Sequence, residues 1–192
     1  MNSRAVSTFK YNFRARGCQV EGPIRFAVGQ AVPGQVLVAR SQRGICAILL
    51  GEDARALRDQ LAAAFPKVEL QPDQAGLQHE LEQVIGFIDE GPCEGSIHLD
   101  IGGTAFQQKV WQVLCGIPAG QTRSYADVAR ALGVPQAVRA VAGACAANVL
   151  AIAIPCHRVV RGDGSVSGYR WGVARKRALL ADEAAKALKW AA

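Results

Sequence analysis

The segment that most constrains the fold runs from Ser124 to Asn148, "SYADVARALGVPQAVRAVAGACAAN". Ser124 is a typical helix N-cap, "GVPQ" makes a tight turn, and proline favours a second helix beginning near Pro135. Two short helices joined in this way outline a helix-turn-helix, whose second helix enters a groove of DNA. The segment therefore predicts a DNA-binding unit in the second half of the chain.

The second predicted helix has two contrasting faces. The face predicted to pack on the core consists of Val138, Val141, Ala142 and Cys145. The opposite face consists mostly of small residues and comprises Gln136, Ala140, Gly143 and Ala147. Small side chains let a helix approach a partner closely, and Arg139 projects from the same region. Alanine is also a good helix former and Arg139 could be a solvated charge, so the spacing alone leaves both interpretations open.

Positive charge is concentrated in the second half of the chain. Residues 1–96 carry 10 Lys and Arg against 11 Asp and Glu, a net charge of −1, whereas residues 97–192 carry 12 against 5, a net charge of +7. This asymmetry favours a polyanion, and nucleic acid in particular, as the partner of the second half.

The first half is predicted to be a small α/β unit. Strands are expected at residues 35–39 and 45–50, and helices at residues 53–65 and 73–89. We expect three parts: a solvated leader over residues 1–33 that need not be ordered, an N-terminal α/β domain over 34–95, and a C-terminal domain over 96–192. "EGPCEG" is the expected linker, and "SIHLDIGG" a strand leading into the second domain.

The C-terminal domain is predicted to be mainly helical. Thr104 with Gln107 three residues later forms a capping box, and an apolar stripe follows until Pro118 and Gly120 end the helix. The fold class is therefore α/β.

Composition narrows the chemistry. No apolar run approaches the roughly 20 residues that span a bilayer, and the first residues lack the apolar stretch of a secretory signal. The 6 cysteines form no C-x-x-C pair and make no ligand cluster with the 3 histidines. We therefore expect a cytoplasmic protein with reduced thiols and without a bound metal, a cofactor or a membrane.

Cys156 is the candidate nucleophile. A free thiol is only a few per cent ionised at neutral pH, so it needs a base or a cationic neighbour, and His157, Arg158 and Arg161 follow it directly. Adjacent side chains of an extended segment point to opposite faces, so His157 would act through a water molecule, with Glu183 as a candidate to orient it. The residues alone leave a buried, inert thiol equally open.

A resemblance favours the nucleophile. "GTAFQQKVWQVLCGIPAGQTRSYADVA", "RAVAGACAAN", "IPCHRVV" and "SGYRWG", in this order, resemble the O6-alkylguanine-DNA alkyltransferase (methylated-DNA–protein-cysteine methyltransferase) family, and the tail is most similar to Ada-type members. The match is dense over residues 99–183 and looser back to Gly34. It implies a ribonuclease H-like N-terminal domain followed by a winged helix-turn-helix-like domain.

The resemblance also implies a function. Such a protein binds double-stranded DNA as a monomer, mainly through the minor groove, and flips O6-methylguanine out of the stack. It transfers the methyl group irreversibly to its own cysteine, with O4-methylthymine as a secondary substrate. The implied catalytic residues are Cys156, His157, Glu183, Asn148, Tyr125 and Lys176. The implied DNA-binding residues are Arg139, Ala140, Gly143, Tyr125 and Arg158. The implied substrate pocket is Cys145, Val159, Tyr169, Arg170 and Trp171.

Two departures from the family pattern bear on the site. Asn148 is followed by Val149 where many members have proline, and Trp171 stands where some relatives have glycine. A tryptophan at the pocket rim would exclude bulky adducts, which predicts poor activity on O6-benzylguanine. The alternatives are a lesion-binding protein that does not transfer the alkyl group, a fragment of an Ada-type transcriptional regulator and, more distantly, a cysteine protease. The intact "PCHR" argues against the first.

Overall fold

The computed structural model describes residues 9–15, 17–91, 95–166 and 168–191, with side chains up to Lys186. The chain forms two compact units, Met1–Gly102 and Gly103–Ala192. The boundary lies beyond the expected one at residue 95, because the strand expected to begin the second domain pairs within the first. Of the expected linker, residues 92–94 lie outside the described residues.

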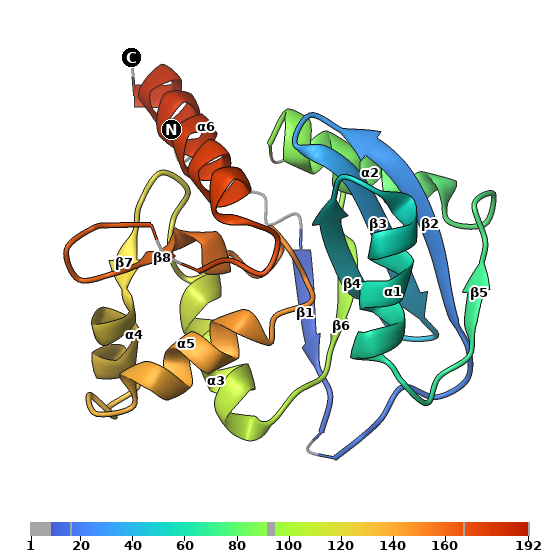
Figure 1. The fold of residues 1–192 in the computed structure, drawn as a ribbon, viewed down its shortest axis with the longest axis horizontal. Coiled ribbons are helices and arrows are strands. Elements are labelled where there is room, and N and C mark those ends of the chain that lie inside the picture. The colour runs from blue at the N-terminus through green and yellow to red at the C-terminus, as the bar shows by residue number, and fades with distance from the viewer. Residues whose placement is uncertain (1–8, 16, 92–94, 167, 192) are drawn as a thin grey trace. The chain divides into compact units, whose positions relative to one another are not determined.

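The N-terminal unit is built on a six-stranded mixed sheet with the order β1-β6-β4-β3-β2-β5 (Figure 1). The strands are β1 (Phe9–Phe13), β2 (Ile24–Ala31), β3 (Gly34–Ser41), β4 (Gly44–Gly51), β5 (Leu70–Pro72) and β6 (Ile97–Ile101). β2, β3 and β4 form an antiparallel meander, whereas β1 with β6, β4 with β6 and β2 with β5 pair in parallel. The predicted α/β class is confirmed.

The β3–β4 hairpin contains the two strands predicted from the sequence, each slightly longer than expected. Its turn ends at Gly44, whose φ is +144°. A Cβ atom at this position would lie 2.6 Å from the carbonyl oxygen of His98, so only glycine fits. β4 is buried at every residue except Gly51, which predicts cover on both faces of the sheet.

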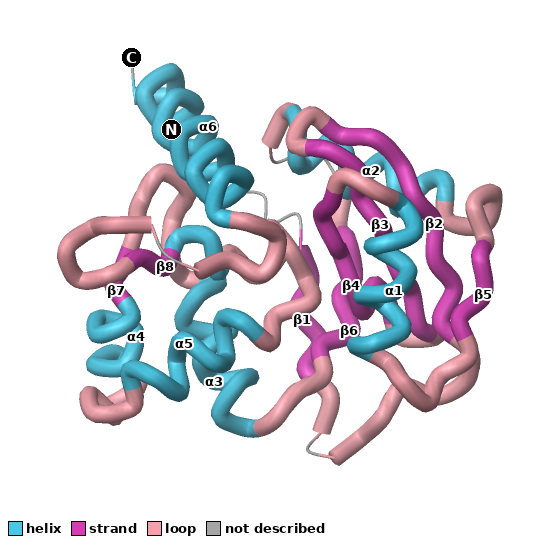
Figure 2. The backbone as a smooth tube through the Cα atoms, viewed as in Figure 1, coloured by secondary structure: helices cyan, strands magenta, loops and turns pink. Residues whose placement is uncertain are grey.

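Helices supply this cover. α1 (Ala54–Ala64) packs on β3 and β4, and α2 (Gln78–Asp89) packs on β2 and β3 from the other side of the sheet (Figure 2). Asp53 caps α1 as predicted, accepting the backbone N–H of Ala56 at 3.0 Å. α2 begins later than the predicted Asp73, because that side chain accepts the N–H of Gly76 at 2.9 Å and closes a turn instead.

The expected solvated leader is wrong over most of its length, because β1 and β2 both belong to the sheet. Phe9 is buried and meets the Phe87 ring edge-on at 4.6 Å between centroids. Arg14, also buried, holds Asp100 of β6 at 2.9 Å, and Ser41 donates to the same carboxylate at 2.5 Å. Polar residues therefore fix β1 and β6 from inside. Residues 1–8 and 16 lie outside the described part of the chain.

The C-terminal unit is mainly helical, as predicted. Its elements are α3 (Ala105–Cys115), β7 (Arg123–Ser124), α4 (Tyr125–Ala131), α5 (Val138–Ala146), the 3-10 helix η1 (Cys156–Arg158), β8 (Val159–Val160) and α6 (Val173–Ala191). The capping box of Thr104 and Gln107 is present, and Ser124 forms a second one with Asp127. β7 and β8 form a short parallel pair beside the helix-turn-helix of α4 and α5.

The second helix of this motif begins at Val138, three residues after the predicted start at Pro135. Pro135 lies in the turn before the helix. In this turn the N–H of Val134 donates to the carbonyl of Ala129, and the N–H of Ala137 donates to the carbonyl of Val134. α5 is held on α3 by the indole of Trp111, which donates to the carbonyl of Ala144 at 2.9 Å. Within the described ranges, no helix is both long enough and apolar enough to cross a membrane.

Candidate active site

The segment before the reactive cysteine is buried and sharply bent. Residues 150–156 are all buried, and Ile152 has a φ of +67°, an uncommon conformation for a β-branched residue. The N–H of Ile154 donates to the carbonyl of Leu150 at 3.0 Å, which closes the bend. The bend leads directly into η1, where Cys156 is 3% exposed.

Asn148 holds this bend together. Its side-chain oxygen accepts the N–H of Leu150 at 2.8 Å, and its Nδ2 donates to the carbonyl of Ile154 at 2.9 Å and to Sγ of Cys156 at 3.2 Å. Because the side chain satisfies the turn by itself, Val149 can follow it without the stiffness of a proline. One amide thus positions the backbone and touches the sulfur.

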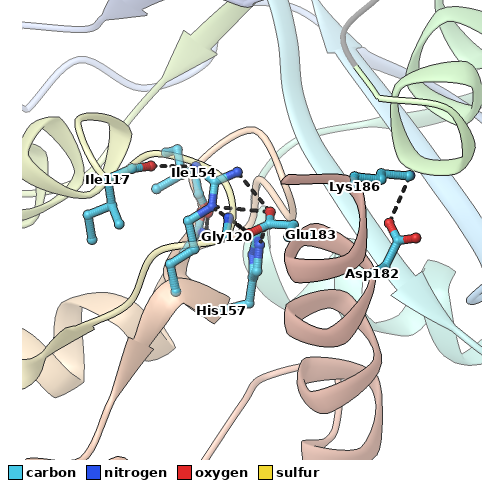
Figure 3. A network of polar contacts seen from close by, with 9 residues as sticks. Ile117, Gly120, Ile154, His157, Asp182, Glu183 and Lys186 are labelled. Atoms are coloured by element: carbon cyan, nitrogen blue, oxygen red, sulfur yellow. Dashed lines mark hydrogen bonds and ion pairs between the residues drawn. The ribbon is translucent and has the colours of Figure 1, made fainter. Parts of the chain in front are cut away.

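Glu183 joins η1 to the C-terminal helix. It reaches from α6 to His157, whose Nε2 lies 2.8 Å from Oε1 (Figure 3). The N–H of Gly120 contacts the other oxygen at 3.3 Å. Arg158 donates to the same carboxylate through Nε and Nη2, and its Nη1 donates to the carbonyl of Ile117 at 2.6 Å.

This position of Arg158 differs from the expected one on the DNA surface. Its side chain is 13% exposed and its guanidinium is used within the protein, so it clamps Glu183 instead of facing a partner. The adjacent pair of Asp182 and Lys186 lies away from this network on the same helix (Figure 3).

Burial and the contacts of Glu183 determine the protonation state and the tautomer of His157. Burial alone would raise the pKa of Glu183, but hydrogen bonds from His157 and Arg158 lower it to about 2, so the carboxylate is ionised at neutral pH. Burial lowers the pKa of His157 more than Glu183 raises it, so the imidazole is neutral. A neutral ring that faces a carboxylate through Nε2 carries its hydrogen there, which leaves Nδ1 as the basic nitrogen. Within the described residues, Nδ1 has no hydrogen-bond partner.

A cavity of about 590 Å³ opens at Cys156. It is lined by Tyr125, Ala142, Cys145, Ala146, Cys156, Arg161, Gly168, Tyr169 and Arg170. The structure therefore brings together four of the expected pocket and catalytic residues with the sulfur, namely Tyr125, Cys145, Tyr169 and Arg170. Aromatic rings and small side chains make a pocket that suits a flat ring system.

Two expected pocket residues lie elsewhere. Val159 is buried in the pairing of β8 with β7, and Trp171, 4% exposed, packs edge-on behind Tyr169 with 5.1 Å between ring centroids. Trp171 is therefore not at the pocket rim, and the steric argument against O6-benzylguanine loses the residue on which it rested.

Lys176 is a fully buried cation next to the cavity. Its Nζ donates to the carbonyl of Val159 at 2.5 Å and lies 6.0 Å from the ring centroids of both Tyr125 and Tyr169. Burial lowers its pKa. The lysine therefore ties the two cavity tyrosines to β8 and places positive charge behind them.

The thiol is protonated at rest. Burial raises the pKa of Cys156 to about 11, although the hydrogen bond from Asn148 and the charges of Lys176 and Arg170 act in the opposite direction. Burial likewise raises the pKa of Cys145 to about 12. The thiol therefore has to give up its proton before it can act as a nucleophile.

The outer face of α5 is exposed and carries mostly small side chains. Arg139, Ala140, Gly143 and Ala146 are exposed, and a Cβ atom at Gly143 would meet nothing within 4 Å. On the small face Ala146 is exposed, whereas the expected Ala147 is the half-buried C-cap; on the core face Ala144 is buried, whereas the expected Ala142 is half-buried and lines the cavity. No group of three or more metal-ligating side chains occurs among the described residues.

Sequence reasoning missed several parts of this site. Ile117 and Gly120 bind Arg158 and Glu183 through backbone atoms, which no side-chain pattern reveals. Ala142, Ala146 and Gly168 line the cavity as small residues. Arg161 also lines the cavity, whereas the sequence predicts it only as a charge near Cys156; its position on the glycine-rich turn "RGDG" is the available signal.

Comparison with known proteins identifies the class. Residues 105–185 match the model of the 6-O-methylguanine DNA methyltransferase DNA-binding domain. The chain is 42% identical over 116 residues to a methylated-DNA–protein-cysteine methyltransferase of Mycobacterium bovis, covering 60% of this chain and 70% of that protein. The chain belongs to the methylated-DNA–protein-cysteine methyltransferase family.

Two further similarities show how much of this chain and of its relatives corresponds. It is 53% identical over 161 residues to the bifunctional transcriptional activator/DNA repair enzyme Ada of Escherichia coli, covering 84% of this chain and 46% of Ada. The chain thus spans about half the length of these Ada relatives. The crystal structure of Mycobacterium tuberculosis OGT in complex with DNA superposes with a TM-score of 0.71 at 31% identity, covering 84% of this chain and 94% of that one.

Proposed function

We propose that this protein repairs alkylated DNA by direct reversal, taking the methyl group of O6-methylguanine onto Cys156 in a single irreversible step. The observation that carries the proposal is the arrangement of Cys156 at an aromatic cavity, with Asn148 on its sulfur and the His157–Glu183 pair beside it. O4-methylthymine, with the same exocyclic O-methyl group, is the secondary substrate.

The protonation states of Cys156 and His157 support a reaction that begins from a neutral thiol. Cys156 loses its proton toward Nδ1 of His157, through one water molecule, and Glu183 stabilises the imidazolium that forms. The sulfur attacks the methyl carbon, an S–C bond forms and the C–O6 bond breaks. The electrons of that bond remain on guanine, which takes up one proton from solvent and stays in the DNA as ordinary guanine. Tyr125 is suited to donate a hydrogen bond to the developing anion.

Irreversibility follows from the product. The product is a neutral thioether whose methyl group is not activated for transfer to a nucleophile, so the alkylated protein has no route back to the thiol. Each molecule therefore acts once, and no cofactor takes part. Lesion binding without transfer is the weaker interpretation, because the acceptor thiol is present and positioned.

The DNA partner is inferred from α5. A methyl group on O6 lies inside the duplex, so the nucleotide has to leave the stack at a cost of a few kcal/mol. The exposed small face formed by Ala140 and Gly143 permits close approach to the DNA, mainly in the minor groove, and Arg139 fills the space left by the base. We propose that a monomer acts in this way on double-stranded DNA in the cytoplasm.

The test is intact-protein and peptide mass spectrometry after incubation with a duplex that contains one O6-methylguanine. We expect the mass of one methylene group on the Cys156 peptide, at a stoichiometry that never exceeds one per protein. Cys156→Ala should abolish it, whereas Cys18→Ala, at an exposed cysteine of the other unit, should not. Tight binding to the duplex without the added mass would contradict the proposal and favour a lesion binder.

A further inference from the structure

Two arginines stand at the mouth of the Cys156 cavity. Arg161 and Arg170 lie near the two ends of the glycine-containing loop that follows β8, and both are exposed while lining the cavity. Neither makes an ion pair within the part of the chain that the structure describes. The mechanism proposed above uses neither of them.

Arg170 is held in place. Its Nη1 donates to the carbonyl of Ala146 at 3.3 Å, and Ala146 is the last residue of α5. A guanidinium is favoured at this negative end of a helix dipole, and only one of its five N–H donors is used there. The side chain is therefore positioned against α5 with donors still available for an anion.

Arg161 is fixed through its backbone. Its carbonyl accepts the N–H of Gly164 at 2.9 Å, and its own N–H donates to the carbonyl of Ser165 at 3.1 Å. Asp163 accepts the N–H of Ser165 at 2.9 Å and completes the turn. The Arg161 side chain is thus exposed at the cavity mouth, with the carboxylate of Asp163 in the same turn.

The charges around the cavity favour an anion at its mouth. Lys176 lies behind the two lining tyrosines, and Arg170 is close enough to Cys156 for its charge to lower the pKa of the thiol. Asp163 only partly offsets this positive charge, and the charge of Glu183 is balanced by Arg158. The cavity is thus aromatic where a base would stack and positive where a nucleotide backbone would pass.

We propose that Arg170, assisted by Arg161, binds a phosphodiester that flanks the extruded nucleotide and so holds the lesion in the cavity. This inference rests on the proposed function. The planar fork of arginine matches phosphate oxygens, and an O6-methylated base carries no negative charge of its own, so the backbone supplies the anion.

The first test compares two substrates in single-turnover methyl transfer. Arg170→Gln should slow transfer from an O6-methylguanine duplex about tenfold, the cost of about one charged hydrogen bond, while transfer from the free base O6-methylguanine falls by much less, because only the effect of the Arg170 charge on the thiol is lost there. The plot of log rate against log salt should become shallower by about 0.9, as for one lost phosphate contact. Arg161→Gln should show a smaller loss of the same kind. Arg177→Gln, which removes an exposed arginine of α6 that does not line the cavity, is the matched control.

The second test identifies the phosphate. Duplexes carry a neutral methylphosphonate immediately 5′ or 3′ of the lesion. One of the two should slow the unmodified protein about as much as Arg170→Gln does, and the variant should lose nothing further on that duplex. Equal losses on duplex and free base would overturn the inference and assign Arg170 to tuning of the thiol. Full additivity on both duplexes would also overturn it. Absence of any transfer by the unmodified protein would instead refute the proposed function.

Discussion

Glu183→Gln tests the cluster that connects α6 to η1. A carboxyl whose pKa falls from its ordinary 4.5 to about 2 stabilises the fold by about 3 kcal/mol at pH 7, since each pKa unit corresponds to about 1.4 kcal/mol. The side chain is only 14% exposed, so solvent screens this little. Loss of the carboxylate also leaves Arg158 without its charged partner, and breaking buried pairs costs a similar amount, about 3–5 kcal/mol. We therefore expect a loss of about 3 kcal/mol.

The stabilisation by Glu183 should decrease as the pH falls. Because the folded-state pKa is depressed, the stabilisation is complete above about pH 4.5 and is lost as the pH falls toward 2. Urea unfolding should show the difference between the two proteins shrinking from about 3 kcal/mol at pH 7 to about 1.4 kcal/mol at pH 3. Asp182→Asn, which removes the neighbouring, half-exposed carboxylate paired with Lys186, should change stability by less than about 1 kcal/mol. If Glu183→Gln proves as mild as this control at pH 7, the electrostatic account of the cluster is wrong.

Three further outcomes are expected. Asn148→Ala should lower the free energy of unfolding in urea by about 2–3 kcal/mol, because it leaves the buried Leu150 N–H unpaired and removes one of the two hydrogen bonds to the Ile154 carbonyl; an unchanged midpoint would contradict this. Iodoacetamide at pH 8 should label exposed Cys18 well before Cys156, whose labelling should accelerate as the pH approaches about 11, as followed by peptide mass spectrometry; equal rates at pH 8 would show that the thiol is already ionised. Arg139→Ala should slow methyl transfer from duplex DNA but not from the free base, and equal losses on both would remove its role in extruding the nucleotide.

Local signals predicted the elements whose ends are fixed by neighbouring residues. Asp53, Thr104 and Ser124 each accept a backbone N–H within three residues. The starts of α1, α3 and α4 could therefore be predicted from the sequence. The β3–β4 hairpin was equally clear, because Gly44 closes a turn between two apolar runs. α2 and α5 begin later than predicted, since Asp73 and Pro135 serve turns that their own residue types permit just as well.

Long-range pairing explains the remaining errors. β1 and β2 carry polar residues between their apolar ones and look solvated until β6 and the hairpin supply partners, and Arg14 looks like a surface charge until Asp100 meets it. Arg158 is likewise predicted to contact DNA, because the sequence does not show that Glu183, 25 residues later, binds its guanidinium.

The sequence by itself determined which residue types this protein has for its chemistry: a thiol followed by an imidazole, a basic second half and a helix with a small-residue face. These follow from composition and spacing within one or two turns of chain. Only the tertiary structure decided which nitrogen of His157 is basic, that Arg158 faces inward and that Arg161 and Arg170 flank the cavity. Protonation and orientation depend on burial and on partners distant in sequence, and these exist only once the chain has folded.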